Sequence, residues 1–468
     1  MTSAPGHGPA ALDVAYEVAE RLRHPGHVAR TARAAFAAVP EALLLPGWQP
    51  ASVLLGHAGI SMLHARRARD DVRWAQVAHA HLAAAAEATR EAGPVAAGDL
   101  VLPARLLAAQ LGGYDRLLAR ATEIHAEAAA RRVARLADRR AEPGRGLSYL
   151  DYDVIAGLAG QGRTLLLSAG HGDERSAHAL TDVLTYLIRM TEPVRVAGTR
   201  VPGWWCDPEQ YVVPRDRETF PRGDFNLGVA HGICGPLALL CLARLAGHDV
   251  PGLTDAIRRV TDWLCVRGRT VDGGGATWPG RVAYEDEIAH IADADQAETP
   301  GARNDAPGAG GGASRERAGW CYGTVGVAWA LYLAGRALAD HALTGRATAA
   351  ISAVLRAPLD HSVGDDPGFC HGRAGVLQAG VRMAAATGDA RLWTGVDAAA
   401  EGVLAVYDEQ TLFGFRQRVR TQKWAGGIDS PALIDGAAGA ALALASYADA
   451  RSGQPVGDHI WDAVFLMS

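Results

Sequence analysis

A Gly-x-x-Gly motif recurs along this chain of 468 residues, and each copy precedes an apolar stretch rich in alanine and leucine. The copies lie at Gly56/Gly59, Gly157/Gly160, Gly232/Gly235, Gly323/Gly326, Gly372/Gly375 and Gly436/Gly439. The third copy marks both ends of its helix, because Pro236 stands where the first helical turn tolerates proline and Gly247 follows the apolar run. The repeat therefore predicts a series of helices, each introduced by a glycine loop.

The later copies predict helices over Val327–Ala339, Val376–Thr387 and Ala440–Ala448, with few charges on any face. Helices that are apolar nearly all round are buried ones. The longer Arg-rich segments between them are predicted to form outer helices that pair with these inner helices. The pattern predicts an all-α fold, an α/α toroid of six to seven helix pairs with its glycine loops gathered at one end. The longest interval, from Gly56 to Gly157, has room for a degenerate copy near Leu111-Gly112-Gly113.

We expect one principal domain over residues 51–468, because a closed ring of repeats shares one core. Residues 1–50 are predicted as a helical lead-in with helices at Leu12–Leu22 and Val28–Val39. Residues 286–314 are rich in Asp, Ala and Gly, which predicts a flexible insertion. A flap over the functional site and a tolerated surface insertion are both open interpretations of it.

The repeat aligns the reactive side chains. Cys321 and Cys370 both stand two residues before the first glycine of their motifs, and His371 stands one residue before it. Equivalent positions in a closed ring point to the same end, so the three side chains can converge. Two thiols and one imidazole suit zinc, and a catalytic zinc has three protein ligands and an open fourth position. The sequence predicts one zinc ion per chain, and the alternative is two buried cysteines beside a hydrogen-bonded core histidine.

Composition limits which classes of partner and which cellular compartment the protein can be expected to have. Charged residues make up 21% of the chain and the formal net charge is -5, which argues against a nucleic-acid partner. The N-terminus lacks the pattern of a secretory signal, and no apolar stretch is long enough to span a bilayer. Six cysteines in so long a chain do not form a disulfide framework, and Cys234 and Cys241 are predicted to lie in the core. We expect a cytoplasmic protein.

Three blocks carry a family resemblance: Asn226–Pro236, Trp320–Ala328 and Cys370–Gly375. Together they resemble the LanC-type lanthipeptide cyclases, from about residue 50 onward. The resemblance implies a toroid that uses zinc to activate a peptide cysteine thiol, which adds to dehydroalanine or dehydrobutyrine and forms a lanthionine or methyllanthionine ring. It also implies a dehydrated precursor peptide as substrate and a dehydratase as partner. A membrane-associated complex stays open, although no transmembrane segment is present.

The addition needs a proton donor, and His231 is the predicted general acid, since it has the right chemistry and shares the repeat position of His371. Its alternative role is a histidine hydrogen-bonded to the backbone at a helix N-terminus. Asp153 resembles an aspartate that reaches the site in the family, where it would orient His231 or take the thiol proton. A capping carboxylate is the alternative for Asp153.

Arg317 matches by position an arginine that the family keeps at its site, where it would hold the enolate oxygen or a substrate carbonyl. A solvated loop residue is the alternative, with Arg315 as the relevant arginine. Tyr322 is a further candidate as a hydrogen-bond donor, or it packs in the core. Asp435 occupies the same repeat position as Tyr322, and we predict that it is a structural cap.

Two other functions are compatible with these residues. The first is a non-catalytic zinc protein that binds a peptide or a small thiol such as glutathione. The second is another zinc-dependent toroid that activates a thiol, such as a protein prenyltransferase, although that reaction needs a basic diphosphate pocket and a carboxylate ligand. The presence of His231, Asp153 and Arg317 beside the predicted ligands favours catalysis.

Overall fold

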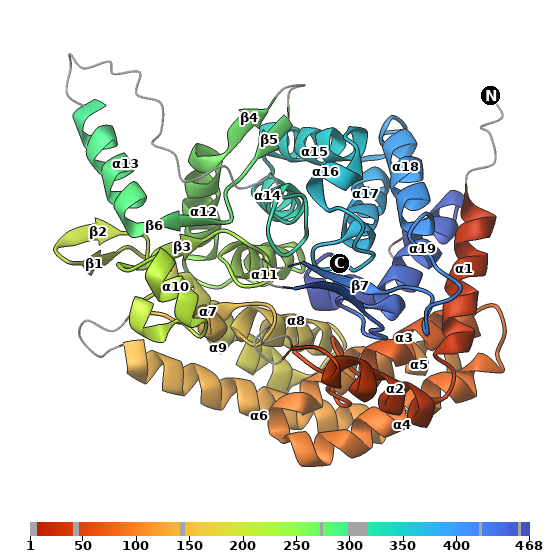
Figure 1. Ribbon diagram of the computed structural model, residues 1–468. Coiled ribbons are helices and arrows are strands. Elements are labelled where there is room, and N and C mark those ends of the chain that lie inside the picture. The colour runs from red at the N-terminus through yellow and green to blue at the C-terminus, as the bar shows by residue number, and fades with distance from the viewer. Residues whose placement is uncertain are drawn as a thin grey trace.

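Helices dominate the protein, and an inner ring of them surrounds its centre (Figure 1). The computed structural model describes residues 7–40, 46–140, 146–271, 275–297, 317–420, 424–456 and 460–468. Within these ranges the seven inner helices are α3 (His57–Ala68), α5 (Val101–Leu111), α8 (Leu158–Ala169), α11 (Cys234–Leu245), α14 (Thr324–Leu338), α17 (Arg373–Thr387) and α19 (Ala437–Arg451). Each packs against the next and α19 packs against α3, which closes the ring. The predicted α/α toroid is confirmed.

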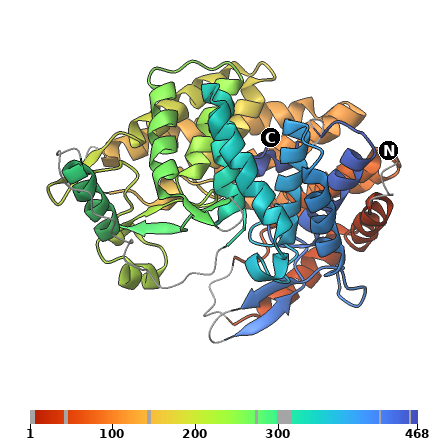
Figure 2. The same ribbon diagram turned by 90° about the horizontal axis from the view of Figure 1, so that it is seen from above.

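An outer helix lies against each inner one. In the same order, the outer helices are α4 (Trp74–Ala92), α6 (Asp115–Arg140), α9 (Glu174–Met190), α12 (Leu253–Arg267), α15 (His341–Arg356), α18 (Leu392–Leu404) and α1 (Gly8–Arg21). The outer partner of α19 is thus the first described helix, α1. Figure 2 shows the red helix next to the N-terminus beside the blue C-terminal helices. Residues 1–50, predicted as a lead-in, supply α1 and α2 (Pro25–Ala37), and α1 adds Ala11 and Val18 to the common core.

The two layers bury their residues differently. In the inner helix α14 every residue is buried except Arg336 and Leu338. The outer helix α9 buries one stripe, which includes Ala179, Val183 and Leu187, and leaves its opposite face to solvent. An all-round apolar helix belongs between neighbours on all sides, whereas an amphipathic one covers them. The apolar repeats of the sequence therefore became the inner layer.

The second glycine of each motif lets the first helical turn approach the loop before it. A Cβ atom on this glycine would lie within 1.9–2.1 Å of the carbonyl oxygen six residues earlier in five copies, Gly59, Gly160, Gly326, Gly375 and Gly439. Real Cβ contacts are essentially never below 3.0 Å, so any side chain would push the helix away from its loop. The spacing of the motif is thus a packing requirement.

Backbone hydrogen bonds connect the glycine loops of successive repeats at one end of the ring. Val154 N donates to Ala230 O, Val229 N to Cys321 O, Cys321 N to Cys370 O, Cys370 N to Ile434 O and Ile434 N to Leu54 O, at 2.9–3.1 Å. All of these residues stand two or three positions before a motif glycine. The connections fix neighbouring loops relative to one another, and the predicted site residues lie on these loops.

Each loop is also closed on itself in five of the copies. The residue after the first glycine donates its N–H to the carbonyl oxygen six residues before that glycine, at 2.9–3.0 Å. These pairs are His57–Pro50, Ile233–Asn226, Thr324–Arg317, Arg373–Asp366 and Ala437–Ser430. The position six before the glycine is therefore a second repeat position with a defined place in the loop.

The seventh helix pair lies in the interval where a degenerate copy was predicted, but its place was wrong. Gly112 and Gly113, with φ of 70° and 79°, follow the C-terminus of α5 and lead into the outer helix α6, so they do not introduce an inner helix. The short helix η2 (Pro94–Leu100), which directly precedes α5, contains Gly98 instead, and the residue three positions later is Val101. Because valine stands where the second glycine would be, the copy has no Gly-x-x-Gly signature.

Short helices and two-stranded sheets fill the connections. The remaining helices are η2 (Pro94–Leu100), α7 (Tyr149–Tyr152), η3 (Pro208–Gln210), α10 (Pro214–Thr219), α13 (Tyr284–Ala297), α16 (Leu359–Ser362) and η5 (Trp461–Phe465). The antiparallel strand pairs are β1 (Val194–Val196) with β2 (Thr199–Val201), β3 (Asp224–Asn226) with β6 (Arg281–Ala283), β4 (Arg269–Val271) with β5 (Gly275–Thr277), and β7 (Gln417–Arg420) with β8 (Ala425–Ile428). The β3–β6 pair leads directly into the His231 loop.

The predicted insertion at 286–314 begins as a helix, since α13 runs to Ala297, and residues 298–314 lie outside the described ranges. Cys234 and Cys241 are fully buried, as predicted. All six cysteines are free thiols. Among the described helices, none has the length and apolar character needed to cross a membrane.

Candidate metal centre and acid–base pair

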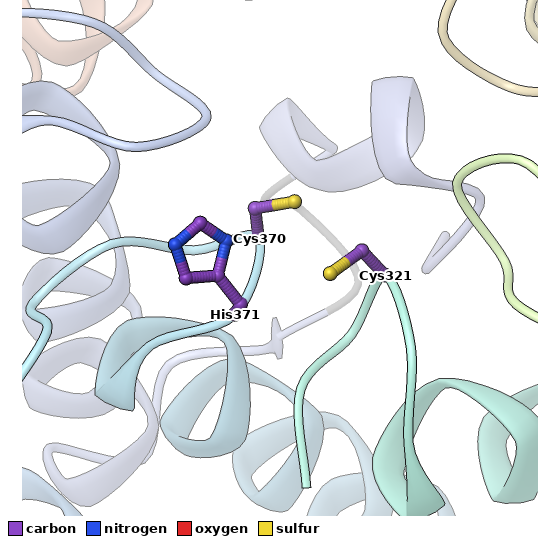
Figure 3. Close-up of side chains that lie close together, drawn as sticks. All are labelled: Cys321, Cys370 and His371. Atoms are coloured by element: carbon purple, nitrogen blue, oxygen red, sulfur yellow. The ribbon is translucent and has the colours of Figure 1, made fainter. Parts of the chain in front are cut away.

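Three candidate metal ligands converge at the loop ends of two neighbouring inner helices. Cys321 precedes α14, whereas Cys370 and His371 precede α17. One ligand atom from each residue, the two Sγ atoms and a ring nitrogen, lies within 4.8 Å of the others. Figure 3 shows the three side chains directed toward one another from two loops. The described part of the chain contains one such group of metal-binding side chains.

The cluster is closed on one side and open on the other. Cys321 is 7% exposed, whereas the side chain of His371 is 45% exposed. A catalytic zinc site needs three protein ligands on one side and access for a fourth ligand on the other. The chemistry of the donors and their convergence therefore fit zinc with an accessible position.

The electrostatic surroundings of this cluster favour a positive charge. Hydrogen bonds from Cys370 and from His371, opposed by burial, lower the pKa of Cys321 well below that of a free thiol. The hydrogen bond to Cys321, together with burial, raises the pKa of Cys370. Burial lowers the pKa of His371, but Asp435, Cys321 and Asp366 outweigh it and raise the value to about 10. The acidic groups outnumber the single base, and a dication would balance them.

A carboxylate faces each nitrogen of the His371 ring, and sequence reasoning assigned neither carboxylate to the site. Asp435 Oδ1 lies 3.7 Å from Nδ1, and Asp366 Oδ2 lies 3.9 Å from Nε2. Whichever nitrogen binds a metal, the other faces a carboxylate, which is the usual arrangement around metal-bound histidine. The structure thus adds two carboxylates to the predicted trio.

The two carboxylates differ in their own partners. Asp366 accepts backbone N–H groups from Gly368 at 2.7 Å and from Arg418 at 2.8 Å. Asp435 Oδ1 is a buried atom that has no hydrogen-bond partner within the described residues, and burial raises the pKa of Asp435 to about 7. The prediction that Asp435 is a structural cap is wrong, because α19 has Gly436 at its N-cap and no side-chain capping bond.

An acid–base pair occupies the adjacent loops. His231 Nδ1 and Asp153 Oδ2 are 2.6 Å apart, and the edge of the Tyr149 ring packs on the imidazole with ring centroids 5.1 Å apart. Asp153 is fully buried, and its Oδ1 accepts the backbone N–H groups of Ala156 and Gly157 at 2.7 and 2.6 Å. Asp153 therefore caps the loop before α8 and contacts His231 at the same time.

Tyr322 directly follows Cys321, and its hydroxyl is held by a residue that sequence reasoning missed. Asn226 donates its side-chain N–H to Tyr322 Oη at 2.8 Å and accepts the N–H of Gly228 at 3.0 Å. Burial raises the pKa of Tyr322, so its hydroxyl keeps its proton. Because the hydroxyl oxygen accepts from Asn226, the O–H hydrogen is left to donate to another group.

Asn226 and Asp366 share a repeat position with Arg317, six residues before the first motif glycine. The backbone carbonyl of Arg317 accepts the N–H of Thr324 at 3.0 Å, and its side chain is exposed. The guanidinium has no hydrogen bond or ion pair to any residue that the structure describes. Arg315, the alternative arginine, lies outside those residues.

The metal cluster and the acid–base pair lie on loops that touch. Val229 N donates to the carbonyl oxygen of Cys321, and His231 follows Val229 by two residues. A Cβ on Gly228 would meet the carbonyl of Cys321 and the ring of Tyr322, so the two loops are in close contact. The loops that carry the two groups are therefore direct neighbours.

A helical toroid with two thiols, an imidazole and a histidine–aspartate pair at one end defines a class of candidate metalloproteins. The family whose members are described as "Lanthionine synthetase C-like protein" matches residues 47–461. This chain belongs to that family, which the LanC-type resemblance of its sequence blocks had predicted.

A known protein resembles this chain in sequence, and a solved structure resembles it in fold. It is 23% identical over 230 residues to "Nisin biosynthesis protein NisC" of Lactococcus lactis subsp. lactis, a match that spans 49% of this chain and about half, 48%, of that relative. Its structure superposes on that of "Nisin cyclase" with a TM-score of 0.69 at 16% sequence identity, covering 94% of this chain and 98% of the other. The structural likeness supports the fold.

Proposed function

We propose that the protein is a zinc-dependent lanthipeptide cyclase. Its substrate would be a precursor peptide in which a dehydratase has already converted serine or threonine to dehydroalanine or dehydrobutyrine, and the reaction would take place in the cytoplasm. One observation carries the proposal: Cys321, Cys370 and His371 converge within 4.8 Å on loops adjacent to the His231–Asp153 pair. Family membership and the resemblance to nisin cyclase support the same reaction.

Cys321, Cys370 and His371 would hold the zinc ion. When bound, zinc supplies a Lewis acid that lowers the pKa of a substrate thiol and keeps the sulfur nucleophilic near neutral pH. The 45% exposure of the His371 side chain supports access of a peptide to this side of the cluster. The nucleophile would be a cysteine thiol of the substrate peptide, so Cys321 and Cys370 would act only as ligands.

His231 would protonate the α-carbon of the enolate that forms when the thiol adds. Its Nδ1–H donates to the buried Asp153 carboxylate, which leaves Nε2 to carry and release the second proton. The carboxylate would hold the imidazole ring in place during proton transfer, and the two backbone N–H groups on its other oxygen fix the carboxylate itself. The side chain of His231 is 31% exposed, which supports direct contact with substrate.

The remaining charge develops on the carbonyl oxygen of the dehydro residue. Sulfur adds to the β-carbon, the electrons of the carbon–carbon double bond move to the carbonyl, and the enolate then takes a proton at the α-carbon. The thiol loses one proton and the α-carbon gains one, so the reaction is an isomerisation. Tyr322 would donate its O–H to this oxygen, and Arg317 would supply a positive charge at the rim of the site.

The proposal is tested by metal content and ring formation measured together. Purified wild type, Cys321→Ala and Cys370→Ala are compared with Cys241→Ala, which makes the same change at a fully buried cysteine outside the cluster. The substrate is a synthetic peptide with one cysteine and one dehydroalanine. Because cyclisation leaves the mass unchanged, ring formation is read as loss of a thiol that N-ethylmaleimide can alkylate.

We expect one zinc per chain in the wild type and in Cys241→Ala. With either protein, ring formation should consume the peptide thiol, so that N-ethylmaleimide no longer alkylates it. Cys321→Ala and Cys370→Ala should lose both properties. Wild type that binds zinc but leaves the thiol free would instead indicate a non-catalytic zinc protein. Well-folded wild type without zinc would refute the proposed mechanism.

A further inference from the structure

The described C-terminal residues, 460–468, lie near the middle of the ring, where the C-terminus is marked in Figure 1. Four inner-helix segments hold them. Asp462 is fully buried and accepts from Arg382 at 2.6–2.7 Å and from Gln378 at 2.6 Å, both on α17. Trp329 on α14 donates to the carbonyl of Leu466 at 3.2 Å, and further bonds come from α8 and α19. The segment is therefore a fixed part of the core.

This segment forms an aromatic cluster with the two loops that bear the cysteine ligands. The cluster consists of Trp320, Phe369, Trp461 and Phe465, all at most 3% exposed. Trp320 directly precedes Cys321, and Phe369 directly precedes Cys370. Each ligand cysteine is thus one residue away from a ring in the cluster.

Phe465 contacts both loops. Its ring stacks on Phe369 with centroids 3.9 Å apart and packs edge-on against Trp320 at 5.0 Å. Trp320 also donates its indole N–H to the carbonyl oxygen of Phe465 at 3.1 Å. Aromatic pairs of this kind add stability and orientation beyond the area they bury. One side chain therefore joins the α14 loop to the α17 loop directly beneath the cysteines.

The positions of the two sulfur atoms depend on this contact. A cysteine side chain has a single torsion before its sulfur, so the backbone of its loop largely sets where the sulfur lies. Zinc–sulfur bonds are about 2.3 Å long, and a site misplaced by about 0.5 Å binds poorly. Between these two loops the Cys321 N–Cys370 O hydrogen bond supplies one restraint, and the rings supply the other.

We propose that Phe465 is a positioning residue for the metal centre, because it sets the separation of the loops that carry Cys321 and Cys370. This inference rests on the proposed zinc site and assigns part of its affinity to a residue from the C-terminal segment. Phe465 does not contact the metal or the substrate in this role. It acts through Trp320 and Phe369.

The test compares Phe465→Leu with Phe413→Leu, which makes the same change at an equally buried phenylalanine outside the aromatic cluster. Zinc dissociation constants are measured by competition with a chromophoric chelator, and folding is checked by circular dichroism and thermal denaturation. Cobalt is bound in place of zinc, because its visible absorption reports the geometry of the thiolate ligands. We expect Phe465→Leu to weaken zinc binding by about 10- to 100-fold and to change the cobalt spectrum.

Phe413→Leu should lower the melting temperature without either change. Equal zinc affinity in the two folded variants, or equal loss in both, would overturn the inference. Trp320→Phe provides a second variant if Phe465→Leu does not fold, because it keeps an aromatic ring and removes the indole N–H that donates to Phe465. Failure of the proposed function is distinguishable, since wild type itself would then not bind zinc or not form rings.

Discussion

The acid–base pair and the metal cluster, the two halves of the candidate site, differ in how closely their carboxylates are paired with hydrogen-bond donors. On the acid–base side, the buried Asp153 carboxylate has His231 and two backbone N–H groups, all at 2.6–2.7 Å. On the metal side, the nearest carboxylate contacts of His371 are 3.7 and 3.9 Å long, and Asp435 Oδ1 has no hydrogen-bond partner within the described residues. In the first half the carboxylate has donors at hydrogen-bond distance, whereas the second half gathers several acidic groups around one imidazole.

This difference separates two kinds of electrostatic design. A buried carboxylate with short contacts to donors is already compensated, so it can position a proton without any added group. A cluster of thiols and carboxylates around one imidazole becomes favourable when a dication joins it. The contrast predicts that substitutions in the acid–base pair change catalysis alone, whereas substitutions in the metal cluster change metal binding first.

The largest expected effect comes from His231→Ala compared with His371→Ala, since the two histidines share one repeat position. We expect His231→Ala to retain zinc and to lose about 10²- to 10⁴-fold in the rate of ring formation, the usual contribution of a general acid. His371→Ala should lose both zinc and activity. Zinc content by mass spectrometry and the alkylation assay measure the two properties.

Loss of zinc from His231→Ala would remove the distinction between the two halves. Unchanged activity with full zinc would show that another group donates the proton. Asp153→Asn provides a milder check, because it keeps the shape of the side chain. It should lower activity at constant zinc affinity.

A smaller effect is expected from Asp435→Asn, which removes a negative charge beside His371 and leaves the geometry nearly unchanged. We expect zinc affinity to fall by about 10- to 100-fold, since carboxylates behind a metal-bound histidine typically contribute this much. Chelator competition measures it, and Asp153→Asn is the matched control with the same chemical change. Equal zinc affinity in the two variants would show that Asp435 has no role at the metal.

Most of the fold could be predicted from one physical constraint. A Cβ atom on the second motif glycine would lie 1.9–2.1 Å from a carbonyl oxygen in five copies, so the sequence cannot vary there without moving a helix. Because of that constraint, the motif marks the start of an inner helix in the sequence. It failed for the α5 pair, where Val101 stands in place of the glycine, and only the three-dimensional ring revealed that copy. The role of α1 as outer partner of α19 was also invisible, since it joins distant segments.

The candidate site was predictable where its residues occupy the two repeat positions directly before the first motif glycine. Asn226 and Asp366 were missed, although both stand six residues before a motif glycine and both accept the N–H of the residue two positions on. A second repeat position was therefore present in the sequence. Asp435 was assigned wrongly because a carboxylate before a helix suits a cap as well as a site, and only its neighbours distinguish the two roles.

The smallest expected effect is that of Tyr322→Phe, which tests the border between the two halves. The change removes the hydroxyl that Asn226 fixes and keeps the ring that packs against Gly228. Loss of one hydrogen bond costs about 0.5–1.5 kcal/mol, so we expect a roughly 2- to 10-fold slower ring formation with unchanged zinc affinity. Asn226→Ala should produce a similar loss if orientation of the hydroxyl is what matters. A change in zinc affinity with either variant would place Tyr322 with the metal half, and no change in rate would leave it as a packing residue.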